Sequence, residues 1–221
     1  FETRFARLDE LSRTGESRTS PMRTQRSYPD WDLVLFRGAQ LDPMPLNEDV
    51  PVNLETVIGP GAKQPMVLKL PFYVSHMSFG ALSSEAKTAL ARGASQSGTA
   101  ICSGEGGMLP AEREAANQYI YELGTAPFSH LEEAITNAEA IELKIGQAAK
   151  PGLGGHLPAD KVTPEIAEIR RLGPGEGSHS PGRHTGIDTP EDLKRRVAEL
   201  KEMTGATSQN LEIAQTELAS V

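Results

Sequence analysis

The chain has 221 residues, 38% of them hydrophobic and 24% charged, a balance typical of a globular protein rather than a disordered one. Its formal net charge of −8 disfavours general binding to nucleic acid or anionic membranes, because such binding requires Lys and Arg to neutralise phosphates. The single cysteine excludes an intrachain disulfide and any all-cysteine zinc or iron–sulfur site within the chain. With no long apolar run and an Arg-rich, polar start, we expect no membrane span, no signal peptide and a cytoplasmic location.

Residues 1–65 are expected to form an extension rather than a core. The first part of this extension alternates charged, Ser and Thr side chains, which is typical of a surface arm. A short apolar run from Trp31 to Phe36 then precedes a Pro-rich stretch from Asp42 to Pro51. Such a segment usually wraps a core built elsewhere.

From Met66 onward, short apolar runs alternate with glycine-rich loops and helical patterns. The apolar runs predict strands over residues 67–70, 72–77, 98–102 and 140–145. Helix starts are predicted at three N-cap residues, namely Ser83, Thr163 and Thr189. The first of these helices is expected to bury a face formed by Ala86, Ala89, Leu90 and Ala94, and a further helix is expected over 131–137.

This alternation predicts an α/β fold with a parallel sheet. Of the 21 glycines, 16 lie between Gly80 and Gly186, and three glycine-rich loops each follow directly on a predicted strand. In a (β/α)₈ TIM-type barrel such loops form the functional face, although a doubly wound sheet also places ligands at strand ends. Only three or four barrel strands are evident, so residues 66–205 are expected to form the first half of a barrel. Residues 206–221 are expected to form an unassigned helix.

Two of the loops carry polar groups suited to a ligand. Ser103-Gly-Glu-Gly-Gly107 exposes backbone amides and holds Glu105 at a cleft, unless it is a flexible loop with a solvated carboxylate. Gln147 and Lys150 follow a buried strand, where an ammonium group can offset the charge of a reduced cofactor or a carboxylate substrate. The alternative is that both are polar surface residues.

Other chemistry-bearing residues fit ordinary roles better. Cys102 ends a buried strand with no base near it in sequence, which favours a small core residue over a nucleophile. Arg170 is either a surface charge or a clamp for a carboxylate. The spacing of His156, His179 and His184 matches no zinc pattern, so no metal site is predicted.

Taken in order, several of these segments resemble the FMN-binding synthase domain of the glutamate synthase family. The resemblance covers about Pro71 to Gly205 and is closest to the short forms that lack a glutaminase domain, with N-methylglutamate synthase large subunits also near. The matching motifs are Met77-Ser-Phe-Gly-Ala-Leu-Ser83, Ser103-Gly-Glu-Gly-Gly107, Gln147-Ala-Ala-Lys-Pro-Gly-Leu-Gly-Gly155, Leu157-Pro158, Lys161-Val-Thr, Ile166-Ala-Glu-Ile-Arg170 and Ser180-Pro181.

The resemblance implies a (β/α)₈ barrel in which reduced FMN passes a hydride to the imine of 2-oxoglutarate and ammonia, giving L-glutamate. It implies roles as flavin-lining residues for Met77, Ser78, Gly80, Ser103 and Gln147. It implies contacts with the 2-oxoglutarate carboxylates for Gln147, Lys150 and Arg170, with His156 standing where other members have Gln. Lys150 and Glu105 are the implied catalytic residues, the latter beside the ammonia-entry side.

The chain also departs from the family pattern. It lacks an N-terminal catalytic Cys and the cluster cysteines, so an iron–sulfur cluster is not supported, and glutaminase and electron-donor partner proteins are expected. We expect the second half of the barrel to be absent from this sequence, because of an internal gap, a truncation or a split gene. The alternatives are an N-methylglutamate synthase-type enzyme using methylamine, or a non-catalytic half-barrel subunit. The oligomeric state, including a homo-oligomer, stays open.

Overall fold

The computed structural model describes residues 2–16, 31–35, 37–62, 65–147, 153–204 and 210–212. The helices and 3-10 turns are α1 (Glu2–Thr14), η1 (Trp31–Leu33), α2 (Ser84–Ser97), α3 (Pro110–Ala115), η2 (Pro127–His130), α4 (Glu132–Thr136), η3 (Ala159–Lys161), α5 (Pro164–Arg170) and α6 (Pro190–Met203). The strands are β1 (Thr56–Ile58), β2 (Met66–Leu68), β3 (Ile101–Cys102), β4 (Tyr119–Leu123), β5 (Ala140–Leu143), β6 (His156–Leu157), β7 (Ser178–His179) and β8 (Asn210–Glu212).

The central element is a parallel sheet in the order β3-β4-β5-β8. A parallel bridge between Val74 and Ile101 places the predicted strand over 72–77 beside β3, as a single-residue pairing. The strands therefore follow one another in space in the order in which they occur along the chain. The fold is mixed α/β, and the described residues form no closed barrel.

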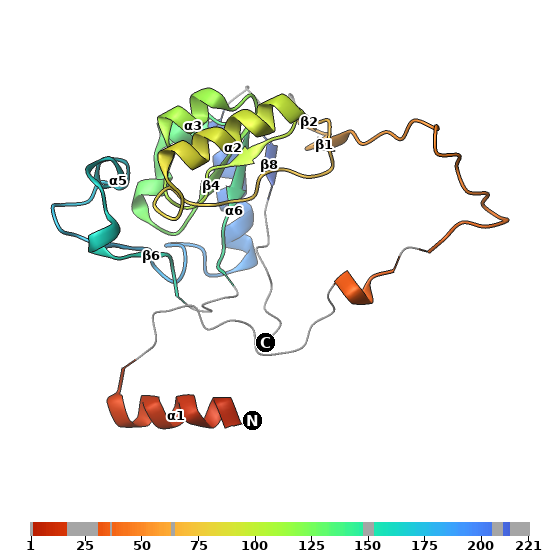
Figure 1. Cartoon of the computed structure of the whole chain (residues 1–221). Helices are drawn as coiled ribbons and strands as arrows, with labels where there is room; N and C mark the ends of the chain where they lie inside the picture. The colour runs from red at the N-terminus through yellow and green to blue at the C-terminus, as the bar shows by residue number, and fades with distance from the viewer. Residues whose placement is uncertain are drawn as a thin grey trace.

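The two faces of this sheet pack against different elements. Residues Tyr119, Tyr121 and Leu123 of β4 are buried against α2, α4 and α6, and Figure 1 shows α2 and α3 lying together over the sheet. The opposite face, called the inner face below, is lined by Ala100, Cys102, Ile120, Glu122, Ala140 and Glu142. The antiparallel β1–β2 hairpin packs Met66 and Leu68 against its apolar members. Among the described residues, the helices that pack against β4 and β5 in the main core thus lie on one side of the sheet.

The predicted helix starts are confirmed by their side-chain caps. Ser83 accepts a hydrogen bond from the backbone amide of Ala86, and Thr163 accepts one from the amide of Ile166. Thr189 forms a full capping box with Asp192 at the start of α6. These caps satisfy amide groups that have no partner inside the first turn of a helix.

Several expectations for the core segments are wrong. Ala89 is exposed, because the buried stripe of α2 runs through Lys87, Ala91 and Ala94. The strand expected over 98–102 begins only at Ile101, since Gly98 has a φ of +70° and ends α2. Strand β5 ends at Leu143 rather than at residue 145, and it is buried along its whole length. Helix α3 and strand β4 were not predicted.

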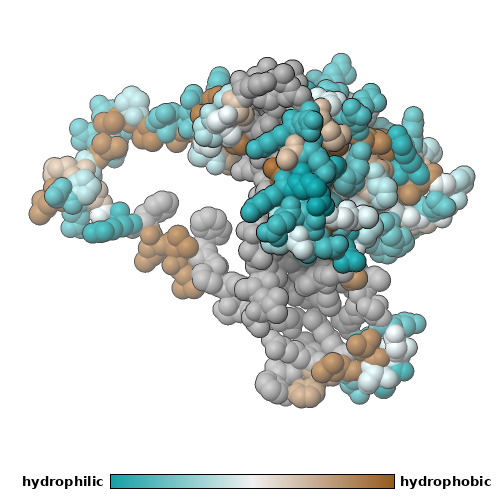
Figure 2. Space-filling model, turned by 180° about the vertical axis from the view of Figure 1, so that it is seen from behind, coloured by the Kyte–Doolittle hydropathy of each residue, from teal (hydrophilic) through white to brown (hydrophobic). Residues whose placement is uncertain are grey.

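The expectations for both ends of the chain also need correction. The helix expected over 206–221 is wrong at Asn210–Glu212, which pair with β5 as strand β8. The rest of that range lies outside the described residues. Near the start, Glu2–Thr14 form α1, which was not expected. The segment expected to wrap the core extends away from the sheet, with Leu35 and Leu41 both 86% exposed (Figure 1). Figure 2 shows hydrophobic side chains spaced along this arm.

Candidate functional site

Polar groups gather where the parallel strands end, at an edge that we call the carboxyl edge and define by residues 76–80, 103–107, 124–126 and 144–147. Two of its loops touch backbone to backbone. Gly104 has a φ of +68°, and a Cβ atom there would lie 2.5 Å from the amide nitrogen of Ser78. Only glycine allows this contact. The predicted flavin-lining residues Ser78 and Ser103 are thereby brought to neighbouring loops.

Lys87 of α2 holds these two loops together through hydrogen bonds to their backbones. Its ammonium group is buried, and it donates hydrogen bonds to the carbonyl oxygens of Met77 at 2.6 Å and Ser103 at 2.8 Å. It also pairs with Glu112 of α3, whose Oε1 lies 2.8 Å away. Burial raises the pKa of Glu112, and the nearby ammonium group opposes that rise. The positions of Met77 and Ser103 therefore depend on a charge contributed by a helix.

Glu105, the predicted catalytic acid, lies in a second charged group. Its Oε2 is 3.0 Å from the Nζ of Lys144, and the same Nζ lies 3.2 Å from Glu122 on the inner face. Burial raises the pKa of Glu122. Burial alone would lower the pKa of Lys144, but the two carboxylates raise it above its ordinary value. Lys144 is thus held as a cation between Glu105 and Glu122.

A small hollow at the carboxyl edge is lined by Glu105, Lys144 and Gln147, together with residues 153–155 and the loop at Pro181. Gly155 closes it on one side, because a Cβ atom there would overlap the carboxylate of Glu105. Lys150 lies outside the described residues, so the structure brings together two of the predicted polar residues, Glu105 and Gln147, and adds Lys144 to them.

Arg170 lies buried at the end of α5, between the two glycine-containing loops. Its Nη2 donates a hydrogen bond to the carbonyl oxygen of Phe79 at 2.6 Å, and its guanidinium lies 5.6 Å from the ring centroid of Phe128. Cβ atoms at Gly80 and Gly106 would lie 3.3 Å and 3.1 Å from Nη2. Burial lowers the pKa of Arg170, while Glu105 opposes that change. In this structure Arg170 supports the loops that carry Gly80 and Glu105.

His156 is placed differently from the other predicted residues. It is exposed on β6 and stacks on His179 of β7, with ring centroids 4.2 Å apart. The third histidine of that group, His184, is buried and lies 2.6 Å from the backbone oxygen of Lys144. His184 is therefore a buried residue with a backbone contact, whereas His156 and His179 form a stacked pair.

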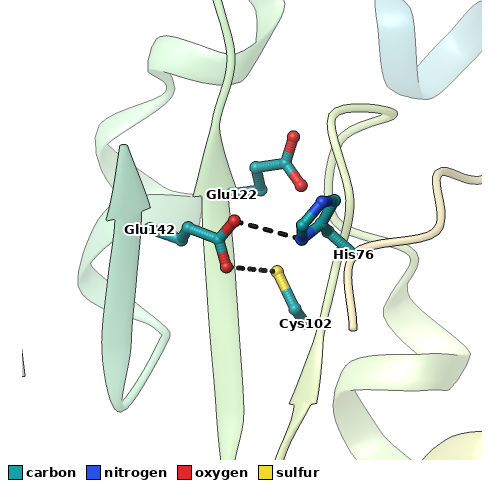
Figure 3. Close-up of side chains that lie close together, drawn as sticks. All are labelled: His76, Cys102, Glu122 and Glu142. Atoms are coloured by element: carbon teal, nitrogen blue, oxygen red, sulfur yellow. Dashed lines mark hydrogen bonds and ion pairs between the residues drawn. The ribbon is translucent and has the colours of Figure 1, made fainter. Parts of the chain in front are cut away.

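A further polar cluster lies on the inner face and combines His76, Cys102, Glu122 and Glu142 (Figure 3). His76 Nδ1 is 3.2 Å from Oε1 of Glu142, and the thiol of Cys102 lies 3.5 Å from Oε2. Burial raises the pKa of Cys102 well above its ordinary value, and the hydrogen bond with Glu142 raises the pKa of His76. Burial acts to raise the pKa of Glu142, but its contacts with His76 leave it lowered.

Sequence reasoning missed Lys87, Lys144, Glu122 and Glu142 as site residues. Lys87 gave one signal, since it shares the i, i+4, i+7 spacing of Ala91 and Ala94 and so falls on the buried face of α2. Glu122 and Glu142 gave another, since each is embedded in an apolar run of strand type.

The fold and the carboxyl edge define an α/β protein whose polar loops follow consecutive parallel strands. The chain belongs to the glutamate synthase family: residues 22–216 match the model of the conserved region in glutamate synthase. It is 39% identical over 184 residues to a glutamate synthase large subunit-like protein of Rhizobium meliloti (strain 1021), covering 82% of this chain and 41% of that protein.

Two further relatives show the same relationship. An archaeal glutamate synthase [NADPH] of Methanocaldococcus jannaschii is 42% identical over 152 residues, covering 69% of this chain and 29% of that protein. The glutamate synthase [NADPH] large chain of Bacillus subtilis (strain 168) is 38% identical over 136 residues, covering 59% of this chain and 9% of that protein. The chain therefore spans less than half the length of these relatives. Within the described residues, no helix is long and apolar enough to cross a membrane.

Proposed function

We propose that this chain supplies the first half of an FMN-binding (β/α)₈ barrel that reduces the imine of 2-oxoglutarate and ammonia to L-glutamate. Three observations support the barrel: the sequential order of the parallel strands, the helical layer on one face, and the polar loops at one edge. A doubly wound sheet would instead reverse its strand order and carry helices on both faces.

The observation that carries the functional proposal is the close meeting of residues 77–80 and 103–107 beside Glu105 and Lys144. A side chain at Gly106 would collide with the backbone of Phe79, so the two loops meet through their backbones without a side chain between them. Within the described part of the chain, the amides of Glu105 and Gly106 donate no hydrogen bond. These features fit a flat cofactor with polar ring edges, which binds against backbone amides that have no hydrogen-bond acceptor.

In this proposal FMN supplies the hydride, and the residues of the chain bind and orient its partners. Met77, Ser78, Gly80, Ser103 and Gln147 line the flavin. Gln147 and Lys150 hold the 2-oxoglutarate carboxylates, because an amide and an ammonium group are donors suited to them. Glu105, already paired with Lys144, faces the nitrogen donor. Arg170 and His156 are proposed substrate contacts as well, with Arg170 acting from its buried place under the loops.

The proposed reaction has two steps, formation of the imine and its reduction. Ammonia condenses with the keto group of 2-oxoglutarate and releases water, and the resulting imine then takes up a hydride and a proton to become L-glutamate. Ammonia from a separate glutaminase and electrons from a separate donor protein are the co-reactants. A methylamine substrate would give N-methylglutamate by the same steps, so turnover with ammonia against methylamine distinguishes the two products.

The test is flavin retention by the 221-residue chain. After incubation with FMN and gel filtration, we expect flavin absorbance to co-elute with the protein at one equivalent, and 2-oxoglutarate to perturb the flavin spectrum. Lys150→Met should keep the flavin and lose the perturbation, because it removes only a charge that binds the carboxylates. The exposed-residue change Lys194→Met is the matched control and should preserve both signals. Flavin that elutes entirely apart from the folded protein contradicts the proposal.

A further inference from the structure

Four side chains able to bind a metal ion converge on the inner face, three of them from neighbouring strands and the fourth from the segment beside β3. His76 follows the segment paired through Val74, Cys102 ends β3, Glu122 lies in β4 and Glu142 lies in β5. One donor atom of each lies within 4.8 Å of the donor atoms of the others. Figure 3 shows the imidazole, the thiol and the two carboxylates directed toward one common space.

Glu142 has His76, Cys102 and the Tyr73 hydroxyl as partners, whereas ion pairs leave Glu122 short of positive charge and of hydrogen-bond donors. Glu122 is fully buried, and its Oε2 has no hydrogen-bond partner among the described residues. Its other oxygen faces Lys144, but that ammonium group is shared with Glu105. A buried carboxylate is costly unless it is paired and hydrogen-bonded or coordinates a metal. Glu122 therefore has a buried oxygen that a nearby cation would stabilise.

The donor set indicates which cation fits. A thiol and an imidazole are ligands of zinc and of related transition metals, whereas calcium and magnesium prefer oxygen atoms alone. In a tetrahedral zinc site the ligand atoms lie roughly 3.3–3.8 Å apart. The His76–Glu142 contact of 3.2 Å and the Cys102–Glu142 contact of 3.5 Å are already close to that spacing.

We propose that His76, Cys102, Glu122 and Glu142 form a closed site for one divalent transition-metal ion of the zinc type. Binding replaces the proton of the Cys102 thiol, which leaves to solvent, and involves no oxidation or reduction. The His76 side chain is 34% exposed and provides the route of entry. The ion ties strands β3, β4 and β5 to the segment that carries His76, at the level where the loops of the carboxyl edge begin. This site is independent of flavin binding.

The test uses chelator-treated protein without FMN, titrated with Co²⁺ and followed by absorption spectroscopy. We expect saturation at one equivalent, intense visible bands of tetrahedral cobalt, a thiolate-to-cobalt charge-transfer band, and displacement of the cobalt by Zn²⁺. Cys102→Ser should abolish the charge-transfer band. Glu142→Gln should weaken binding by at least about tenfold, since even the loss of an outer-shell partner has an effect of that size.

His179→Gln is the matched control, because it removes an exposed imidazole from β7 and should leave the titration unchanged. Should Cys102→Ser fail to fold, His76→Gln changes a partly exposed ligand and should lower the affinity for cobalt in the same way. Zn²⁺ should also raise the Tm of the native chain but not that of His76→Gln. Absence of saturable binding, or a cobalt spectrum that none of these ligand substitutions alters, overturns the proposal.

Discussion

The ammonium group of Lys87 and the carboxylate of Glu112 form a buried ion pair, 2.8 Å apart, between helices α2 and α3. The same ammonium group donates hydrogen bonds to the carbonyl oxygens of Met77 and Ser103, which lie in the two loops of the carboxyl edge. One side chain thus joins two helices to both loops of the candidate flavin site. Loss of this contact affects packing and site geometry together.

Lys87→Met is expected to lower the free energy of unfolding by about 3–5 kcal/mol, because it leaves the buried Glu112 carboxylate without its cation. Urea denaturation provides the measurement. Adding Glu112→Gln to Lys87→Met should recover part of the loss, since no unpaired charge then remains. A double variant less stable than Lys87→Met would contradict the importance of the charge.

Gly104→Ala is expected to destabilise the chain and abolish FMN retention, because it combines a φ of +68° with a collision at the amide of Ser78. The matched control is Gly93→Ala in α2, where a Cβ atom meets nothing within 4 Å. That change should stabilise the chain by up to about 1 kcal/mol, because alanine favours a helix over glycine. Melting temperatures should therefore shift in opposite directions for the same substitution.

Acidification below neutral pH is expected to lower stability through His130 and His184. Burial lowers the pKa of both, and Arg196 adds to the effect. The Nε2 of His130 donates to the carbonyl oxygen of Gly124 while its Nδ1 accepts from Arg196, so the neutral ring fits best. The unfolded chain, with histidine pKa values of about 6.5, binds these protons first. Stability present above pH 6.5 is therefore lost as the pH falls toward the folded values.

The measurement for this prediction is the free energy of unfolding between pH 7.5 and pH 5. The double substitution His130→Gln/His184→Gln should flatten the decline over that interval, because glutamine does not titrate. Each single substitution should flatten it by part of that amount. A decline equally steep in the double variant would assign the effect to other groups.

Thr189→Ala is expected to destabilise α6 by about 1 kcal/mol, because it removes the side chain that caps the amide of Asp192. Asp192 in turn accepts from the Thr189 hydroxyl, the backbone amides of Asp188 and Thr189, and Arg195, and these contacts lower its pKa to about 2. Thermal unfolding followed by circular dichroism gives the measurement. Thr136→Ala, near the end of α4, changes the same residue type away from any N-cap and should cost less.

The helix starts of this fold could be predicted from sequence, whereas its buried charges could not. Ser83, Thr163 and Thr189 act through hydrogen bonds within one turn, so local sequence suffices to identify them. Strand β4 was missed because Glu122 interrupts its apolar run, and Lys144, which pairs with this buried carboxylate, comes from a later segment. A partner so distant in sequence cannot be predicted from the residues around Glu122.

The same reason explains the error at β8. The spacing of apolar residues around Leu211 is compatible with a helix, but Asn210–Glu212 find an open strand edge at β5 and pair with it. Among the site residues, Glu105 was predicted from the glycines that flank it. Its pairing with Lys144 depends on the neighbouring positions of β3, β4 and β5 in the sheet.

The contact from Arg170 to the carbonyl oxygen of Phe79 spans 91 positions of sequence. During synthesis, β3, β4 and β5 are all complete before α5 has been made, and until then the loop at Phe79 lacks its guanidinium support. Helix α6 and strand β8, which complete the core and the sheet, are made later still. The loop at Phe79 therefore gains its full set of contacts only when the segment that follows β5 is present.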